Sequence, residues 1–145
     1  MALQKQITNL RTGHANAYWR LTGIAIDAHS GNIQLVLSGY ADAAARAAGR
    51  QPDDRRDWQM GRAAFASLAF QPAVGATVYD VLANASYGVI RSTRRPLPPG
   101  TELHEDGSVT LPNGEEFAAG DVEQTDPENG ATWTVPSEFA DALDV

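Results

Sequence analysis

Hydrophobic and polar positions form their clearest pattern in the first third of the chain. Residues 17–26 are rich in aromatic and β-branched side chains, residues 27–32 supply turn formers, and residues 33–40 return to β-forming side chains. Aromatic and β-branched side chains pack well on a pleated sheet, and a turn-forming stretch between two such segments is typical of two antiparallel strands. The pattern therefore predicts a β-hairpin.

The two-residue period of the hairpin predicts which side chains face the core. Ile33, Leu35 and Leu37 are two residues apart, so they share one face of the second strand. In the first strand the apolar positions change face at Gly23. Because glycine within a strand often marks a bulge or a bend, we expect a β-bulge at this residue.

The segment after the hairpin combines a short helix with a third apolar stretch. Residues 41–49 are rich in alanine, which has the highest helix propensity, and predict a short surface helix with Gly49 just past its end. Residues 51–57 are polar and of mixed charge, which is typical of a loop. The apolar pattern from Trp58 to Phe70 predicts a third strand, with a helix as the alternative.

A longer amphipathic helix is predicted after Pro72, a residue that suits the first turn of a helix. We expect this helix to cover one face of the hairpin sheet and to end before the proline-rich residues 96–100. Its apolar side chains recur at the three- and four-residue spacing of one helical face, at Val74, Val78, Val81, Leu82, Ala85 and Val89.

Short β segments and turns follow residue 100. Asn113-Gly114 is the strongest short hairpin signal in this part, since both residues tolerate positive φ. Residues 131–135 predict a last strand, and residues 137–143 predict one helical turn capped by Ser137.

These elements define the expected fold class and domains. The class is α+β, with a small antiparallel β-sheet, one packed amphipathic helix and a β-rich acidic C-terminal arm. We expect a core domain at residues 1–95 and the arm at residues 96–145.

Charge is divided unevenly along the chain. The first hundred residues contain all eleven Lys and Arg residues and six acidic ones, whereas residues 101–145 contain twelve acidic residues and no basic one. The first part therefore has a net charge of +5 and the last part a net charge of −12, which gives −7 overall. Unlike patches on one small protein favour contact with a charged partner or with a second copy.

Length and composition narrow the class of protein. A chain of 145 residues, 43% hydrophobic and 20% charged, is typical of one folded domain. The absence of cysteine excludes disulfides, a thiol nucleophile and Cys-ligated metals. With no secretory signal and no run of eighteen apolar residues, we expect a soluble protein made in the cytoplasm. The acidic net charge argues against direct contact with nucleic acid.

No spacing of side chains indicates a catalytic or metal site. His14, His29 and His104 lie at least fifteen residues apart, without the i, i+4 spacing of a helical metal site, so solvated histidines are the simpler interpretation. The C-terminal carboxylates occur in turn sequences, where a solvated acidic face is expected rather than a catalytic pair. We therefore expect no enzyme activity, no cofactor, no metal and no small-molecule substrate.

Two sets of residues are candidates for a protein interface. Arg91, Arg94 and Arg95 form the densest basic group, and their guanidinium groups suit carboxylates of an adjacent subunit. A solvated helix end, where cations favour the helix dipole, is the alternative interpretation. The acidic part supplies the second set, Glu115, Glu116 and Trp133. The aromatic ring of Trp133 suits either an interface or a small hydrophobic core.

The order of elements resembles that of a known group of proteins. It consists of a short N-terminal lead, a hairpin ending in LVLSGY at residues 35–40, an alanine-rich stretch at residues 42–49 followed by RQP, and a helix containing YDVL at residues 79–82. This order is similar to small virion proteins of tailed bacteriophages, whose genes lie among those for tail and baseplate components. The resemblance covers residues 1–90 and implies a non-enzymatic structural protein, present in several symmetric copies.

The sequence thus predicts a virion component of the tail, baseplate or connector, synthesised in the host cytoplasm. Its expected partners are copies of itself and other virion proteins, with no membrane contact. We expect the three arginines of one copy to meet the acidic arm of the next, in a head-to-tail contact. Removal of residues 97–145 should then abolish assembly and leave the core folded. The alternative is a small acidic inhibitor that imitates nucleic acid and binds a basic host protein as a compact monomer.

Overall fold

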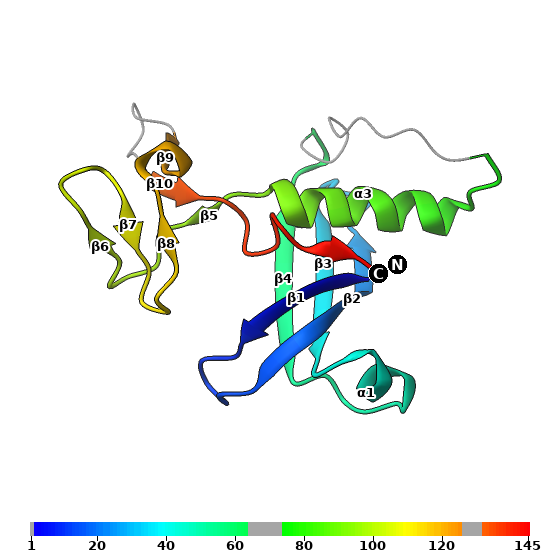
Figure 1. Cartoon of the computed structure of the whole chain (residues 1–145). Coiled ribbons are helices and arrows are strands. Elements are labelled where there is room, and N and C mark those ends of the chain that lie inside the picture. Colours follow the sequence, from blue (N-terminus) through cyan, green and yellow to red (C-terminus); the bar gives the residue numbers. More distant parts are fainter. Residues whose placement is uncertain (1, 64–73, 126–131) are drawn as a thin grey trace. The chain divides into compact units, whose positions relative to one another are not determined.

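The computed structural model describes residues 2–63, 74–125 and 132–145 (Figure 1). These residues have an α+β fold that is mostly strand, with a five-stranded antiparallel main sheet, two small three-stranded sheets and one helix longer than seven residues. The expected fold class is confirmed. Two compact units are present, Met1–Arg91 with Asp141–Val145, and Ser92–Ala140.

The main sheet belongs to the first unit and has the strand order β11-β1-β2-β3-β4. The expected hairpin is confirmed as β2 (Ala15–Ile26) and β3 (Ile33–Tyr40). The sequence did not predict two further strands, β1 (Leu3–Thr8), which pairs with β2, and β11 (Leu143–Asp144), which pairs with β1. Because β11 pairs with β1, the last residues of the chain belong to the first unit.

The core of the main sheet follows the predicted alternation. Ile33, Leu35 and Leu37 are at most 5% exposed. The register between β2 and β3 shifts between Leu21 and Gly23, which confirms the expected bulge. Because of the extra residue in the bulge, Leu21 and Ile24 face the same side of the sheet although they are three residues apart.

The short alanine-rich helix is confirmed as α1 (Ala43–Ala47). The side chain of Asp42 accepts a hydrogen bond from the Ala45 N–H (2.7 Å), which satisfies one of the free donors in the first turn. Ala48 is the C-cap residue, so Gly49 follows the helix as expected.

The third strand begins earlier than the sequence predicted. It is β4 (Asp54–Met60), so its first half lies in the stretch expected to be a loop. β4 is an edge strand of the main sheet, where charged side chains face solvent and protect the edge from further pairing. The charged residues of this edge strand explain why residues 54–57 were predicted to be a loop. Residues 64–70 of the expected strand lie outside the described residues.

The amphipathic helix is confirmed as α3 (Val78–Ser92), which crosses the strands of the main sheet in Figure 1. Its first turn is capped by Thr77, whose Oγ1 accepts from the Asp80 N–H (3.2 Å), while the Asp80 side chain accepts from the Thr77 N–H (2.9 Å). The expected opening at Pro72 lies outside the described residues.

The buried face of α3 agrees with the prediction at Ala85 and Val89 and differs from it at the start of the helix. Val78 is 76% exposed and Val74, before the helix, is fully exposed, so the apolar stripe does not continue through the first turns. Burial begins further along, where the helix packs, at Ala83, Ala85, Ser86, Tyr87, Val89 and Ile90. No helix among the described residues is long and apolar enough to span a membrane.

The second unit contains two three-stranded sheets. The first has β10 (Thr132–Val135) between β5 (Arg95–Pro96) and β9 (Glu123–Thr125), which confirms the expected last strand. A 3₁₀ turn at Ala119–Asp121 precedes β9.

The second small sheet contains the hairpin predicted from Asn113-Gly114. Its strand order is β6 (Glu102–Leu103), β7 (Val109–Thr110) and β8 (Glu116–Phe117). Gly114 has a φ of +85° at the turn between β7 and β8, as the sequence signal requires.

The chain ends in a single turn at the position predicted for one helical turn, followed by a strand that the sequence did not predict. Ser137 does act as a cap, since its Oγ accepts from the Phe139 N–H (3.1 Å). A single turn follows, and the backbone of Val145 then exchanges two hydrogen bonds with Ala2 (2.8 and 3.0 Å). Pairing with β1 therefore makes Leu143, the last residue of the predicted turn, part of a strand.

Candidate functional site

The three arginines predicted at an interface each contact a carboxylate of their own chain. Arg91, in the last turn of α3, donates two hydrogen bonds to the carboxylate of Asp144 in β11 (2.7 and 3.1 Å). This bidentate pair joins the helix to the edge of the main sheet. Both side chains belong to the first unit.

The other two arginines lie in the second unit. Arg94 donates to the Thr134 hydroxyl and carbonyl oxygens (3.1 and 3.0 Å) and lies 3.3 Å from the Glu123 carboxylate. Arg95 donates to Glu115 (2.6 Å), and its guanidinium group lies 5.7 Å from the centre of the Phe117 ring. The contacts of Arg94 reach β10 and β9, and those of Arg95 join β5 of one small sheet to β8 of the other.

The acidic and aromatic candidates have different environments. Glu115 is the partner of Arg95 and also accepts from the Asn113 amide (2.8 Å). Glu116 is exposed, and Trp133 is 46% exposed. The structure therefore brings Glu115 and Arg95 together and leaves Glu116 and Trp133 accessible on the second unit.

The histidines do not form a site. His14 and His29 are exposed, and the His104 ring contacts the Thr110 hydroxyl (2.8 Å). Among the described residues, no three His, Cys, Asp or Glu side chains come together in a group able to hold a metal ion.

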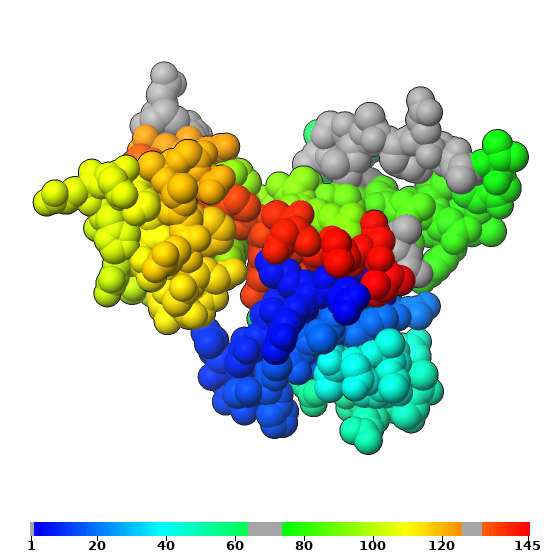
Figure 2. Space-filling view, viewed as in Figure 1, coloured from blue at the N-terminus to red at the C-terminus, as the bar shows by residue number. Residues whose placement is uncertain are grey.

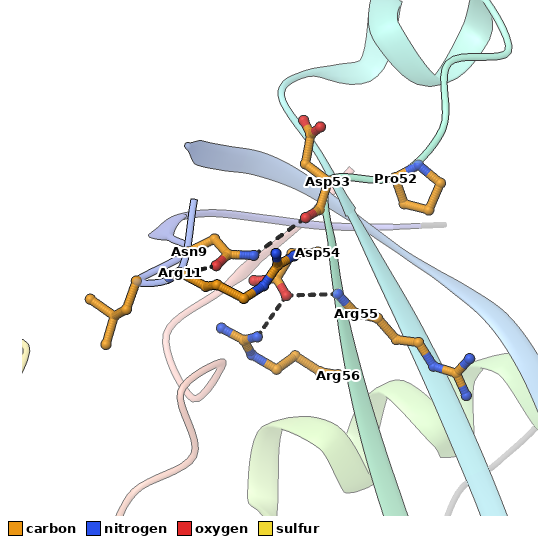
Figure 3. A pocket seen from close by; sticks show the side chains of 8 residues that line it. Asn9, Arg11, Pro52, Asp53, Asp54, Arg55 and Arg56 are labelled. Atoms are coloured by element: carbon orange, nitrogen blue, oxygen red, sulfur yellow. Dashed lines mark hydrogen bonds and ion pairs between the residues drawn. The ribbon is translucent and has the colours of Figure 1, made fainter. Parts of the chain in front are cut away.

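Figure 3 shows a pocket of about 590 Å³ beside the start of β4. Asn9 donates from its amide to the Asp53 carbonyl oxygen (3.3 Å). The Asp54 side chain is 8% exposed and accepts from Arg56 (2.8 Å), while its second oxygen has no hydrogen-bond partner. The Arg56 guanidinium group lies 5.6 Å from the centre of a Trp19 ring in the core. We interpret this charged cluster as support for the end of the sheet.

A second groove, of about 390 Å³, lies between β2 and the first half of α3, and we call it the Arg20 groove. Arg20 comes from β2, and Tyr79, Ala83 and Tyr87 come from one face of α3. No carboxylate among the described residues lies within ion-pair distance of Arg20. The groove therefore combines a cation with aromatic surface. Its other lining residues are Val74, Gly75, Ala76, Asp80 and Asn84.

The two tyrosines of the Arg20 groove differ in burial. Tyr87 is 3% exposed, and burial raises the pKa of its hydroxyl because desolvation disfavours the phenolate. That hydroxyl accepts a hydrogen bond from the Leu21 N–H (2.9 Å) and ties α3 to β2. Tyr79 is 61% exposed and available to a partner.

A third concavity, of about 660 Å³, lies on the small sheet of β6, β7 and β8, and we call it the β6–β8 hollow. Glu102 and Glu116 are exposed and lie opposite Thr110 on either side of β7. His104, Val109 and other residues complete its lining.

The sequence did not point to the Arg20 groove or to the β6–β8 hollow. Tyr79, Ala83 and Tyr87 are spaced by four residues, which was an available signal for one helical face, but nothing in sequence places Arg20 opposite them. Comparisons with protein-family models, curated proteins and solved structures gave no match.

Proposed function

We propose that this protein is a non-enzymatic structural component of a tailed-bacteriophage virion, in the tail, baseplate or connector. It acts by contacts with copies of itself and with other virion proteins. The resemblance of residues 1–90 to small virion proteins suggests this class. The observation that carries the proposal is the composition of the Arg20 groove.

The Arg20 groove has the chemistry of a protein-binding surface. Tyrosine and arginine are enriched in the residues that dominate interface energies, whereas lysine and glutamate are depleted there. Tyr79 exposes apolar surface in the groove beside Arg20, which has no carboxylate partner among the described residues. Asp80 lies in the same groove, but its carboxylate accepts two hydrogen bonds from Thr77. A partner segment with an apolar side chain and a carboxylate would suit this groove.

Purified particles test the proposal directly. Particles from infected cells should contain the protein in a fixed ratio to the other structural proteins, measured by quantitative mass spectrometry after a density gradient. Particles made with Arg20→Glu/Tyr79→Ala should contain less of it, while the control Arg50→Glu, at an exposed arginine outside the groove, should be incorporated normally. Absence of the wild-type protein from particles would refute the proposal.

An acidic inhibitor is the second candidate function. The observation that favours it is the set of exposed carboxylates on the second unit, including Glu102, Glu105 and Glu116, none of which forms an ion pair within the described residues. Such a surface would imitate phosphates. This function predicts a monomer that captures a DNA-binding protein at low salt and releases it at high salt, because surface attraction is screened.

A further inference from the structure

The turn between β1 and β2 is held in one conformation by Asn9. The Asn9 side-chain oxygen accepts from the N–H groups of Arg11 (2.9 Å) and Thr12 (3.3 Å), and its amide donates to the Asp53 carbonyl oxygen. Gly13 closes the turn with a φ of +73° and an N–H bond to the Asn9 carbonyl oxygen (2.7 Å). Asn9 itself is buried, so the turn is fixed to the sheet.

This rigid turn presents an apolar side chain and a cation to solvent. Leu10 is 77% exposed, and Arg11 beside it is exposed. Asp54 lines the same pocket as Arg11 but is paired with Arg56, and no carboxylate of the described residues lies within ion-pair distance of Arg11. In Figure 2 the blue atoms of this region lie at the surface. A fixed turn loses little conformational entropy on binding, so it is suited to insertion into a partner.

The β6–β8 hollow offers the complementary chemistry on the second unit. Its carboxylates, from Glu102 and Glu116, flank Thr110 and form no ion pair within the described part of the chain. The half-buried Phe117 and the exposed Ala118 supply apolar surface to the hollow, whereas Val109 is buried. The hollow thus combines an acidic rim with apolar surface, and Leu10 and Arg11 combine an apolar side chain with a cation.

We propose that Leu10 and Arg11 of one copy insert into the β6–β8 hollow of a second copy of this chain. The Arg11 guanidinium group binds the carboxylates of Glu102 and Glu116, and Leu10 contacts the apolar side chains. The occupant is a second copy because this same chain supplies both complementary surfaces. The two surfaces differ, so the contact is heterologous and repeats head to tail, giving a ring or a filament. This inference rests on the proposed assembly function and names its contact.

Charge reversal tests the pairing. Sedimentation velocity of the full chain should show a concentration-dependent oligomer that dissociates as salt is raised. Arg11→Glu, and separately Glu102→Arg/Glu116→Arg, should raise the dissociation constant by about tenfold or more. The triple variant carrying all three changes restores opposite charges across the contact and should recover the oligomer.

A mixing experiment tests whether the contact is heterologous. Arg11→Ser keeps an intact hollow, and Glu102→Gln/Glu116→Gln keeps an intact turn. Each variant alone should remain a monomer at a concentration where the two mixed together form a dimer and nothing larger. A contact of the turn with the same turn of a second copy would contain a defective turn in every mixed pair and would give no such rescue.

Matched controls separate the contact from general electrostatics. Arg50→Glu and Glu105→Arg/Asp121→Arg make the same charge changes at exposed positions outside both surfaces and should leave the oligomer unchanged. Equal dissociation by the controls, failure of the triple variant to reassociate, or a wild-type chain that remains monomeric would each overturn the inference. The presence of the protein in purified particles is measured independently, so a monomeric chain found in particles would overturn this contact and leave the proposed function standing.

Discussion

The ring of Trp19 lies directly against the backbone of Gly39, its partner in the register between β2 and β3. A Cβ atom placed on Gly39 would lie 2.7 to 2.9 Å from three atoms of the Trp19 ring, closer than packed atoms approach. The indole Nε1 donates to the Lys5 carbonyl oxygen of β1 (3.0 Å), and Trp19 has no exposed surface. A glycine is therefore required at position 39, because any side chain there would clash with the buried Trp19 ring.

Gly39→Ala should destabilise the first unit by about 1 to 3 kcal/mol, the usual cost of forcing an extra group into a packed core. The added methyl group displaces the Trp19 ring, so the tryptophan fluorescence of the folded state should also change. Gly88→Ala is the matched control, because Gly88 is exposed in α3 with open space around it and alanine favours a helix interior by about 1 kcal/mol. Urea unfolding measures the stability of both variants. An unchanged midpoint for Gly39→Ala would contradict the steric requirement for glycine at this position.

The hairpin and its bulge could be predicted because their signals are local. Strands β2 and β3 are neighbours in sequence, and the phase change at Gly23 is visible without any knowledge of the fold. Strand β1 depends instead on partners at both ends of the chain, since Leu3 pairs with both Trp19 and Asp144. A two-residue strand such as β11 has no pattern of its own, so only the completed sheet defines it.

In the candidate site, too, contacts between residues distant in sequence could not be predicted. Sequence placed Arg91, Arg94 and Arg95 together as one basic group, yet they contact three different carboxylates that lie 20 to 53 residues away along the chain. Pairing of this kind depends on the fold, which local composition does not encode. The expectation that these arginines bind a neighbouring subunit stays a prediction. Any such contact has to compete with their existing partners.

Tyr87→Phe should cost about 1 to 3 kcal/mol, because it leaves the buried Leu21 N–H without an acceptor. The ring itself is retained, so packing changes little. Tyr79→Phe removes a hydroxyl from a tyrosine that is 61% exposed and should change stability by less than about 0.5 kcal/mol. Thermal unfolding followed by circular dichroism compares the two. Equal effects would show that the hydrogen bond to Leu21 contributes nothing.

Asp80 should make the helix cap sensitive to acid. Hydrogen bonds from the Thr77 hydroxyl and N–H lower the pKa of this carboxyl below its usual value. The stabilisation is therefore fully present above the unfolded-state pKa of about 3.9 and is lost as pH falls through the lower folded-state value. Asp80→Asn removes this titration, so the difference in melting temperature between wild type and variant should shrink as pH is lowered from 5 to about 2.5. A constant difference over that range would exclude a contribution from this charge.

The C-terminal strand should be necessary for the stability of the first unit. A chain ending at Ala142 loses the two backbone hydrogen bonds between Val145 and Ala2 and the bidentate pair of Arg91 with Asp144. With each bond contributing about 1 kcal/mol, we expect a loss of about 2 to 4 kcal/mol in urea unfolding. Leu143→Ser is the matched control, since its side chain is 66% exposed and the backbone pairing remains.

From the sequence alone we expected that removal of residues 97–145 would abolish assembly and leave the core folded. Because residues 141–145 belong to the first unit, this truncation cannot separate assembly from folding. It removes β11 together with the second unit and exposes the edge of β1, where Ala2 and Leu3 are fully buried in the intact chain. We expect a chain of residues 1–96 to unfold at lower urea concentration than the chain ending at Ala142, or at the same one. A more stable chain 1–96 would show that residues 97–142 destabilise the first unit. Substitutions at Arg11, Glu102 and Glu116 leave both units intact and provide the cleaner test of assembly.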